Sequence, residues 1–142
     1  MSVRSWQVRV EGMSRERVME LRYFCLQYPA KRARLDAARG GFNRIELDGQ
    51  PRGSGRIGRP TEARALRALD SLDRRDVRMI EDAARDVSGG SDAVWCALMR
   101  HVTRGERLEA IRPPMGRNQF YAIRRQFFIR LDRRMIGDAG TV

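Results

Sequence analysis

The sequence predicts an all-α protein, a helical bundle with a C-terminal helix-turn-helix, whose N-terminal helices are joined to the rest by a Gly/Arg-rich linker. Apolar residues recur at helical spacing within 1–40, 61–90 and 91–136. Glycine and proline separate these stretches, and the intervening 41–60 has no helical period. The 142 residues fit one domain of ordinary size, or two small helical pieces joined by a linker.

Residues 1–40 are the predicted N-terminal helical segment. Ser14 can cap a helix, because its side chain can accept a hydrogen bond from a free backbone N–H of the first turn. The apolar stripe of that helix follows as Val18, Leu21, Phe24 or Cys25, and Tyr28. Pro29 stops or kinks it. A second short helix over 30–39 has a basic face, and we expect Gly40-Gly41 to end it.

Residues 41–60 have the composition of a linker, rich in Gly, Arg and Pro. Arg52, Arg56 and Arg59 alternate with glycines in this segment. Two hypotheses stay open for them. They form a basic arm that touches DNA phosphate or enters a minor groove, or the segment is a tether whose charge is incidental.

Residues 61–90 predict one long helix, with Thr61 as its N-cap and a change of phase near 71–76 where it bends or breaks. The segment carries 6 basic and 7 acidic side chains, against 13 and 6 in 1–60 and 10 and 5 in 91–142. A near-neutral helix between two basic ends is expected to be a packing spine or the seam of a homodimer. Its apolar stripe is Leu66, Leu69, Leu72, Val77, Ile80, Ala84 and Val87.

Residues 91–136 predict a helix-turn-helix, followed by a tail over 137–142. Ser91 or Asp92 can cap a first helix that ends at Thr103-Arg104-Gly105. A second helix of about two turns spans 106–111, and the double proline after it forces a turn. The last helix opens after Gly116 and runs to Arg134. One side of this helix carries Phe120, Ile123, Phe127 and Leu131.

The other side of this last helix carries the side chains that we expect to read DNA. A helix that is anchored by aromatic residues and presents Arg, Asn and Tyr from its N-terminal end fits a DNA major groove. The alternative is an ordinary helical hairpin whose arginines form a solvated face. The predicted base-reading residues are Arg117, Asn118, Tyr121 and Arg125. The predicted phosphate-binding residues are Arg104, Arg107, Arg112 and Arg124, together with the linker arginines.

The charge of the chain points to a polyanionic partner. The formal net charge is +11 and the isoelectric point is near 11.2, which makes nucleic acid the first candidate. Lys31 is the one lysine among 29 basic residues. Arginine suits bidentate contacts with phosphate and guanine, although a GC-rich genome produces the same bias.

Several other classes of function lack support in the sequence. His101 has no Ser, Cys or acidic partner at catalytic spacing, and metal, phosphate-loop and dinucleotide motifs are missing, so we expect neither an enzyme nor a cofactor. Cys25 and Cys96 lie in apolar helical stripes and are expected to be buried free thiols. Without a long apolar run, we expect no membrane partner and a location in the reducing cytoplasm.

Two segments carry a family resemblance. LRYFCLQYPAKRARL at 21–35 and HVTRGERLEAIRPPMGRNQFYAIRRQFFIRLDRR at 101–134 resemble small phage and prophage proteins of the ArpU and RinA type. The second segment is also similar to the sigma-factor helix-turn-helix that reads promoters. The matching residues are Gly116-Arg117-Asn118, Phe120-Tyr121, Arg124-Arg125 and Phe127-Phe128.

This resemblance implies a late-gene transcriptional regulator that acts in the host cytoplasm on double-stranded DNA, with RNA polymerase as a further partner. The alternative is a phage DNA-packaging component such as a small terminase subunit, which also combines a helix-turn-helix with an oligomerising helix. Stoichiometry separates the two classes, because a ring of subunits favours packaging and a monomer or homodimer favours regulation.

Overall fold

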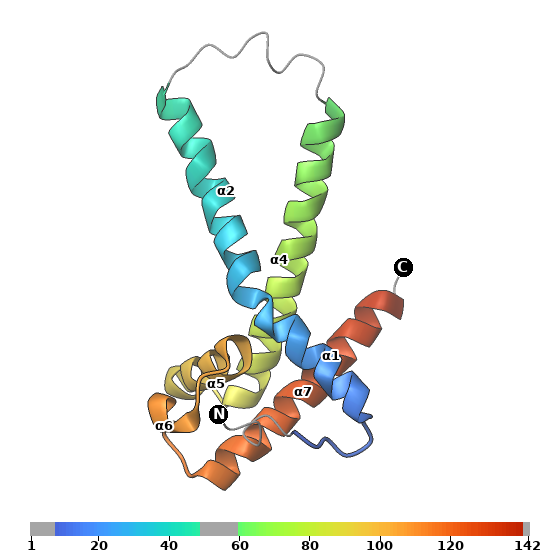
Figure 1. Cartoon of the computed structure of the whole chain (residues 1–142), viewed down its shortest axis with the longest axis vertical. Coiled ribbons are helices and arrows are strands. Elements are labelled where there is room, and N and C mark those ends of the chain that lie inside the picture. The colour runs from blue at the N-terminus through green and yellow to red at the C-terminus, as the bar shows by residue number, and fades with distance from the viewer. Residues whose placement is uncertain (1–7, 49–59, 141–142) are drawn as a thin grey trace. The chain divides into compact units, whose positions relative to one another are not determined.

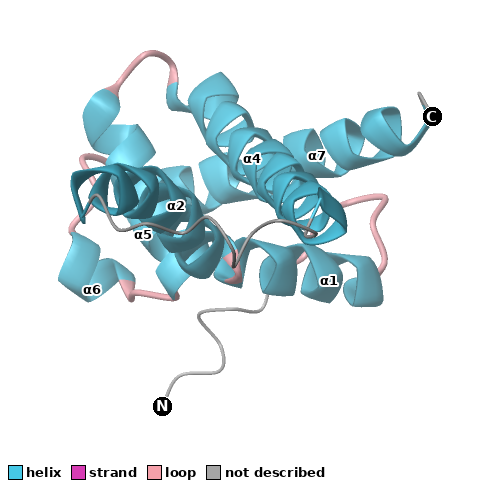
Figure 2. Cartoon of the chain, turned by 90° about the horizontal axis from the view of Figure 1, so that it is seen from above, coloured by secondary structure: helices cyan, strands magenta, loops and turns pink. Residues whose placement is uncertain are grey.

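The computed structural model describes residues 8–48 and 60–140, with side chains over 8–38 and 61–137. Over these ranges every regular element is a helix, which confirms the predicted fold class (Figure 2). The chain divides into two compact units: unit 1, Met1–Pro29 with Arg78–Val142, and unit 2, Ala30–Val77. The helices are α1 (Arg15–Leu26), α2 (Tyr28–Asp48), α4 (Pro60–Ser88), α5 (Asp92–Arg104), α6 (Leu108–Ile111) and α7 (Arg117–Gly140) (Figure 1).

Unit 1 has a continuous apolar core. Helix α1 packs against α5 and α7, and α5 packs against α6. The C-terminal part of α4 adds Ile80, Ala83 and Ala84 to the same core. Removing this much apolar surface from water is the main source of stability for such a unit. The largest fully buried apolar side chains are Phe120, Phe127, Phe128, Leu21, Ile80, Leu98 and Leu131.

The helix ends of unit 1 follow the predicted capping residues. The side chains of Ser14 and Ser91 accept hydrogen bonds from the backbone N–H groups of Arg17 and Val94. Pro29 lies in the first turn of α2, where a missing N–H costs no helical hydrogen bond. The break between α1 and α2 falls at Gln27, two residues before Pro29.

Side-chain hydrogen bonds join distant parts of unit 1. The Tyr28 hydroxyl donates to Glu81 at 2.5 Å, and the Trp95 indole donates to the Glu81 backbone oxygen at 3.3 Å. Arg17 donates to Asp132 at 2.7 Å, which links α1 to α7. These bonds fix the directions of helices that the apolar contacts hold together.

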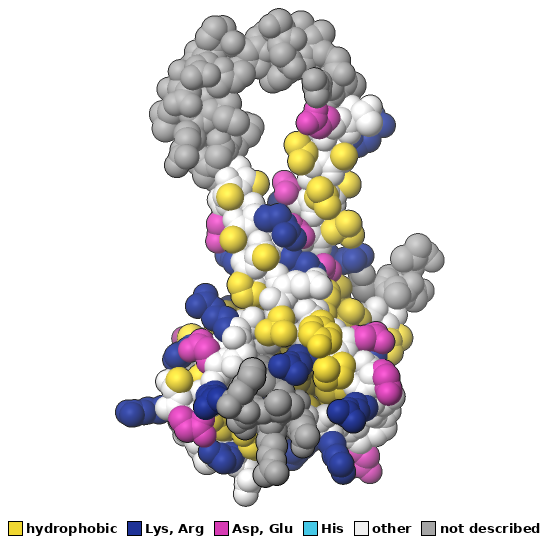
Figure 3. Space-filling view, in the orientation of Figure 1, with side chains coloured by type: hydrophobic (Ala, Val, Ile, Leu, Met, Phe, Trp, Pro, Cys, Tyr) yellow, Lys and Arg dark blue, Asp and Glu magenta, His cyan; other side chains and the backbone are white. Residues whose placement is uncertain are grey.

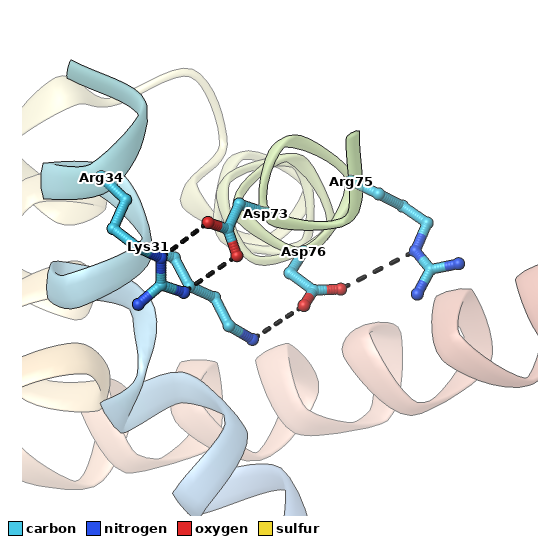
Figure 4. A network of polar contacts seen from close by, with 5 residues as sticks. All are labelled: Lys31, Arg34, Asp73, Arg75 and Asp76. Atoms are coloured by element: carbon cyan, nitrogen blue, oxygen red, sulfur yellow. Dashed lines mark hydrogen bonds and ion pairs between the residues drawn. The ribbon is translucent and has the colours of Figure 1, made fainter. Parts of the chain in front are cut away.

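Unit 2 is held by ion pairs between α2 and the N-terminal part of α4 (Figure 4). Arg34 makes two parallel bonds with Asp73, at 2.8 and 2.9 Å. Lys31 donates to Asp76 at 2.7 Å. Among the described side chains of this unit, the buried ones are Lys31, Asp73 and Val77, so two of the three carry charge.

Helix α4 was predicted to bend or break near 71–76, and the break is absent, because the helix is continuous from Pro60 to Ser88. Its apolar stripe is buried in one part only. Val77, Ile80 and Ala84 are buried, whereas Leu66, Leu69 and Leu72 are 58%, 57% and 47% exposed. Figure 3 shows hydrophobic side chains gathered on this exposed part of α4. The packing-spine prediction therefore holds for the C-terminal part alone.

Three further predictions need correction. Helix α2 runs on to Asp48, so the predicted linker does not begin at residue 41. The cost of a helical glycine, about 1 kcal/mol, weakens a helix without ending it. Helix α7 reaches Gly140 and so takes in most of the predicted tail over 137–142. Cys25 is buried as predicted, but Cys96 is exposed, because it lies about 200° around α5 from the buried Val94.

Candidate nucleic-acid interface

The candidate interface is built on α5, α6 and α7. Gly105 ends α5 in the left-handed conformation, with φ 69°, and its N–H donates to the His101 backbone oxygen at 3.0 Å. Glycine adopts this conformation without a steric penalty. The next residue is also held, because Arg100 donates to Glu106 at 2.6 Å. That hydrogen bond lowers the pKa of the Glu106 carboxyl below its ordinary value, and the chain enters α6 in a fixed direction.

Helix α6 is a single turn that packs through Leu108 and Ile111, both buried. It is shorter than the predicted two turns. Its C-cap residue, Arg112, has φ 53°, and its N–H donates to the Leu108 backbone oxygen at 2.8 Å. Residues other than glycine are disfavoured in this left-handed conformation. Arg112 ends α6 and sends the chain through Pro113-Pro114 into α7.

A buried polar contact joins α5 to α7 behind the predicted reading face. Arg124 Nη1 lies 2.8 Å from His101 Nε2, and His101 Nδ1 lies 2.8 Å from the Glu106 backbone oxygen. A guanidinium can only donate, so Nε2 is the acceptor and the imidazole proton is on Nδ1. Burial, reinforced by the Arg124 charge, lowers the pKa of His101 to about 4. His101 is therefore a neutral structural histidine at pH 7.

Arg124 was predicted to bind phosphate, and the structure contradicts this. The residue is 5% exposed, and burial lowers its pKa to about 10, which still leaves it charged at neutral pH. Its guanidinium carbon lies 4.3 Å from the centre of the Tyr121 ring. A cation over an aromatic face is attractive, so Arg124 supports Tyr121 from beneath and does not face a ligand.

The four predicted base-reading residues share one face of α7. At about 100° per residue, Arg117, Asn118, Tyr121 and Arg125 fall within about 100° of arc. Arg117, Asn118 and Arg125 are exposed, and Tyr121 is half-buried. Phe128 falls on the same arc one turn later, but it is fully buried. The polar face therefore occupies only the first turns of α7.

The opposite face of α7 anchors the helix. Phe120, Phe127 and Leu131 are fully buried, as the predicted stripe required, and Ile123 is half-buried. Phe128, which the stripe left out, packs edge-to-face on Phe127 with ring centres 5.3 Å apart. The predicted base-reading side chains thus stand on a helix whose position is set by its aromatic residues.

The predicted phosphate-binding residues fall into three groups. Arg104, Arg107 and Arg112 are exposed, at the end of α5 and on either side of α6. Arg124 is buried, as described above. Arg52, Arg56 and Arg59 lie outside the described residues.

The sequence did not indicate the acidic neighbour of Arg117. Arg117 donates to Glu109 of α6 at 2.9 Å, and both side chains are more than 60% exposed. An exposed ion pair contributes about 0–1 kcal/mol, so breaking it to release Arg117 costs little. The two residues lie on different helices with a turn between them, so their spacing gives no helical signal, which is why the pair was missed.

Other kinds of site find no support in the described parts of the chain. No group of His, Cys, Asp and Glu there is arranged to hold a metal ion. None of the helices over 8–48 and 60–140 has both the length and the apolar character needed to cross a membrane. Comparisons with protein-family models, with curated proteins and with solved structures found no match for this chain.

Proposed function

We propose that this chain is a sequence-specific, double-stranded DNA-binding transcriptional regulator of the phage late-gene type. The observation that carries the proposal is the division of α7 into two faces. One buries Phe120, Phe127 and Leu131, and the other presents Arg117, Asn118 and Arg125 to solvent. A helix fixed by its core and polar at its N-terminal end has the form that enters a major groove.

Each exposed side chain has a chemical reason to recognise a base. Arginine donates in bidentate fashion to guanine O6 and N7, and asparagine pairs with adenine N6 and N7. Tyr121, held over Arg124, offers its ring and hydroxyl to a base edge or sugar. The exposed Arg104, Arg107 and Arg112 would bind phosphate and fix the register. A net charge of +11 supplies the long-range attraction.

The experiment compares a duplex selected from a random pool with a scrambled duplex, by titration at fixed salt. Arg117→Ala, Asn118→Ala and Arg125→Ala should each cost about 1–3 kcal/mol on the selected duplex and much less on the scrambled one. Arg130→Ala is the matched control, because Arg130 is exposed on the same helix beyond Phe128. Equal losses on both duplexes would show that these residues touch only the backbone.

The phosphate-binding arginines have a separate measurement. Neutralising Arg104, Arg107 and Arg112 together should flatten the dependence of log affinity on log salt by roughly 0.9 for each phosphate that is no longer neutralised. The preference for the selected duplex should stay the same. Arg124 is left out of this set because it is buried.

A packaging component is the second candidate, and the exposed leucines of α4 favour it. Leu66, Leu69 and Leu72 are about half exposed on a single helix, which suits an oligomerising seam. Solution mass and footprinting separate the two candidates. A regulator, as monomer or homodimer, should protect one promoter-proximal site and change transcription by RNA polymerase in a host-cell reporter. A ring that protects repeats near the packaging start, with a silent reporter, would replace the regulator proposal.

A further inference from the structure

Unit 1 contains a half-open pocket of about 800 Å³ that shares one residue, Arg125, with the proposed DNA contacts. Its walls come from residues 8–13, from α1 and from α7. The α1 residues that line the pocket are Arg15, Val18, Met19 and Arg22. They recur at three- and four-residue spacing and so share one face of the helix. The other lining residues are Val8, Arg9, Val10, Glu11, Met13 and Arg125.

The chemistry of these walls is amphipathic. Valine and methionine side chains make the apolar part, in which Val10 and Val18 are buried. Methionine adapts its shape to an apolar ligand because its side chain is unbranched and polarisable. The charged lining consists of four arginines and one glutamate, so the cavity carries an excess of positive charge.

Volume and lining together define the class of ligand. Pockets for small molecules are mostly apolar, enclose about 300–1,000 Å³, and hold a few charged groups that orient the ligand. A DNA phosphate backbone gains nothing from Val and Met side chains, because its surface is polar and hydrated. We infer that this pocket binds an amphipathic organic anion, with its apolar body against Val18 and Met19 and its anionic group on the arginines.

Occupation of the pocket has a consequence for DNA. Arg125 lines the pocket and is also on the exposed face of α7. An anion that holds its guanidinium competes with a base edge for the same donors. The bound anion therefore weakens DNA binding. This second part of the inference rests on the proposed function, whereas the binding site itself does not.

The site is tested on the full chain with 8-anilinonaphthalene-1-sulfonate, an aromatic sulfonate that fluoresces in apolar surroundings. Its uncharged counterpart is N-phenyl-1-naphthylamine. The sulfonate should bind the wild type at least about tenfold more tightly than the amine, because the arginines add charge-assisted hydrogen bonds. Equal binding of the two would overturn the assignment of an anion site.

A pair of double variants locates the bound probe. Arg9→Gln with Arg15→Gln removes two charges from the pocket, and both side chains are exposed. Arg130→Gln with Arg133→Gln removes two exposed charges elsewhere. Sulfonate affinity should fall about tenfold in the first variant and less than about twofold in the second. Equal falls would mean that the probe follows net charge only. A loss of DNA affinity in the first variant, with sulfonate binding unchanged, would assign the groove to DNA.

The coupling is measured by repeating the DNA titration with saturating sulfonate. Affinity for the selected duplex should fall several-fold in the wild type and stay constant in the Arg9→Gln, Arg15→Gln variant. Constant affinity in the wild type would overturn the coupling and leave the site standing. If the chain selects no duplex at all, the proposed function fails, and the probe titrations still decide the site.

Discussion

The two units of this chain bury different kinds of side chain. Unit 1 buries phenylalanine, leucine and isoleucine from α1, α4, α5 and α7. The buried side chains described in unit 2 are Lys31, Asp73 and Val77, while Leu66, Leu69 and Leu72 of the same unit face solvent. Mostly apolar groups are thus inside in the first unit, whereas in the described part of the second unit two of the three buried side chains are ionic and three leucines are outside.

This difference separates stability from specificity. Apolar burial supplies most of the free energy of folding, so unit 1 has the means to hold α7 and its exposed side chains in place. Ion pairs add little net stability but favour one alignment of two helices over others. We expect unit 2 to have a defined helix pairing and a low resistance to unfolding, with its leucines free to meet another surface.

The largest expected effect comes from a matched pair of leucines. Leu131→Ala in unit 1 removes a fully buried side chain and should lower the free energy of unfolding by about 3–5 kcal/mol, because it leaves a cavity. Leu69→Ala in unit 2, where the side chain is 57% exposed, should cost less than about 1 kcal/mol. Chemical denaturation measures both. A large loss for Leu69→Ala would mean that a second copy or another surface covers it.

The next effect concerns the polar contact inside unit 1. His101 has an ordinary pKa of 6.5 and a folded pKa of about 4. Between pH 4 and 6.5 the His101 imidazole is protonated in the unfolded chain and neutral in the folded chain. The free energy of unfolding therefore falls as the pH falls. The loss from pH 7 to pH 4 should be on the order of 3 kcal/mol. The measurement is the free energy of unfolding against pH.

His101→Gln is the control for that slope, because the chain has no other histidine. The variant should lose the pH dependence between about pH 4 and 6.5, whatever its absolute stability. Below pH 4 the wild type should lose further stability, since Asp73 and Glu106 have lowered pKa values and their pairs break on protonation. An equal slope in both proteins between pH 4 and 6.5 would contradict the neutral, buried His101.

A smaller effect is expected from the ionic contact of unit 2. Asp76→Ala takes the carboxylate away from Lys31, whose side chain is 10% exposed. Leaving a largely buried ammonium without this carboxylate should lower the stability of unit 2 by about 2 kcal/mol, a figure already reduced for its partial exposure. The loss would be measured as faster hydrogen exchange of the α2 amides. Asp70→Ala, a half-buried acid on the same helix, is the comparison, and equal effects would deny the Lys31 contact any special role.

The smallest effect lies at the surface of unit 1. Glu109→Gln releases Arg117 from an exposed ion pair and should change stability by less than about 1 kcal/mol. It should strengthen binding to the selected duplex by about twofold to fivefold, since Arg117 no longer has to leave a carboxylate. Glu16→Gln removes an equal charge from an exposed position on α1. An equal gain in duplex affinity in both variants would mean that only the net charge of the chain matters.

The sequence predicted the helices of unit 1 and three of their end residues, because these depend on local chemistry, whereas the predicted N-cap Thr61 lies inside α4, which begins at Pro60. Ser14, Ser91 and Gly105 end or begin helices where expected, since each acts on its own backbone within a few residues. The apolar face of α7 was also predicted from spacing alone. Periodicity shows which face is apolar, however, and not what covers it. Leu69 continues the stripe of Ile80, but only the second meets a core.

The candidate site was predicted less completely, for a similar reason. Arg124 and Arg125 are neighbours of one residue type, but Arg124 is buried against His101, 23 residues earlier in the chain, while Arg125 is exposed. Phe128 was omitted because its place on the helix matches the polar arc, and its burial depends on contacts from distant segments. Arg15 and Arg22 of the pocket share one face of α1, but Arg125 joins them from more than 100 residues later in the chain, which no spacing rule detects.

The contrast between the two cysteines gives the molecule a single natural point of attachment. Cys25 is fully buried, whereas Cys96 is exposed on α5 beside Trp95. A thiol-reactive dye should therefore label one position without any substitution, because a thiol shielded from solvent reacts slowly. The Trp95 indole is held by its hydrogen bond to the Glu81 backbone oxygen, so the surface beside the label has a fixed arrangement. A polarity-sensitive dye on Cys96 would report a change in the surroundings of α5 in the wild-type chain, in solution and in real time.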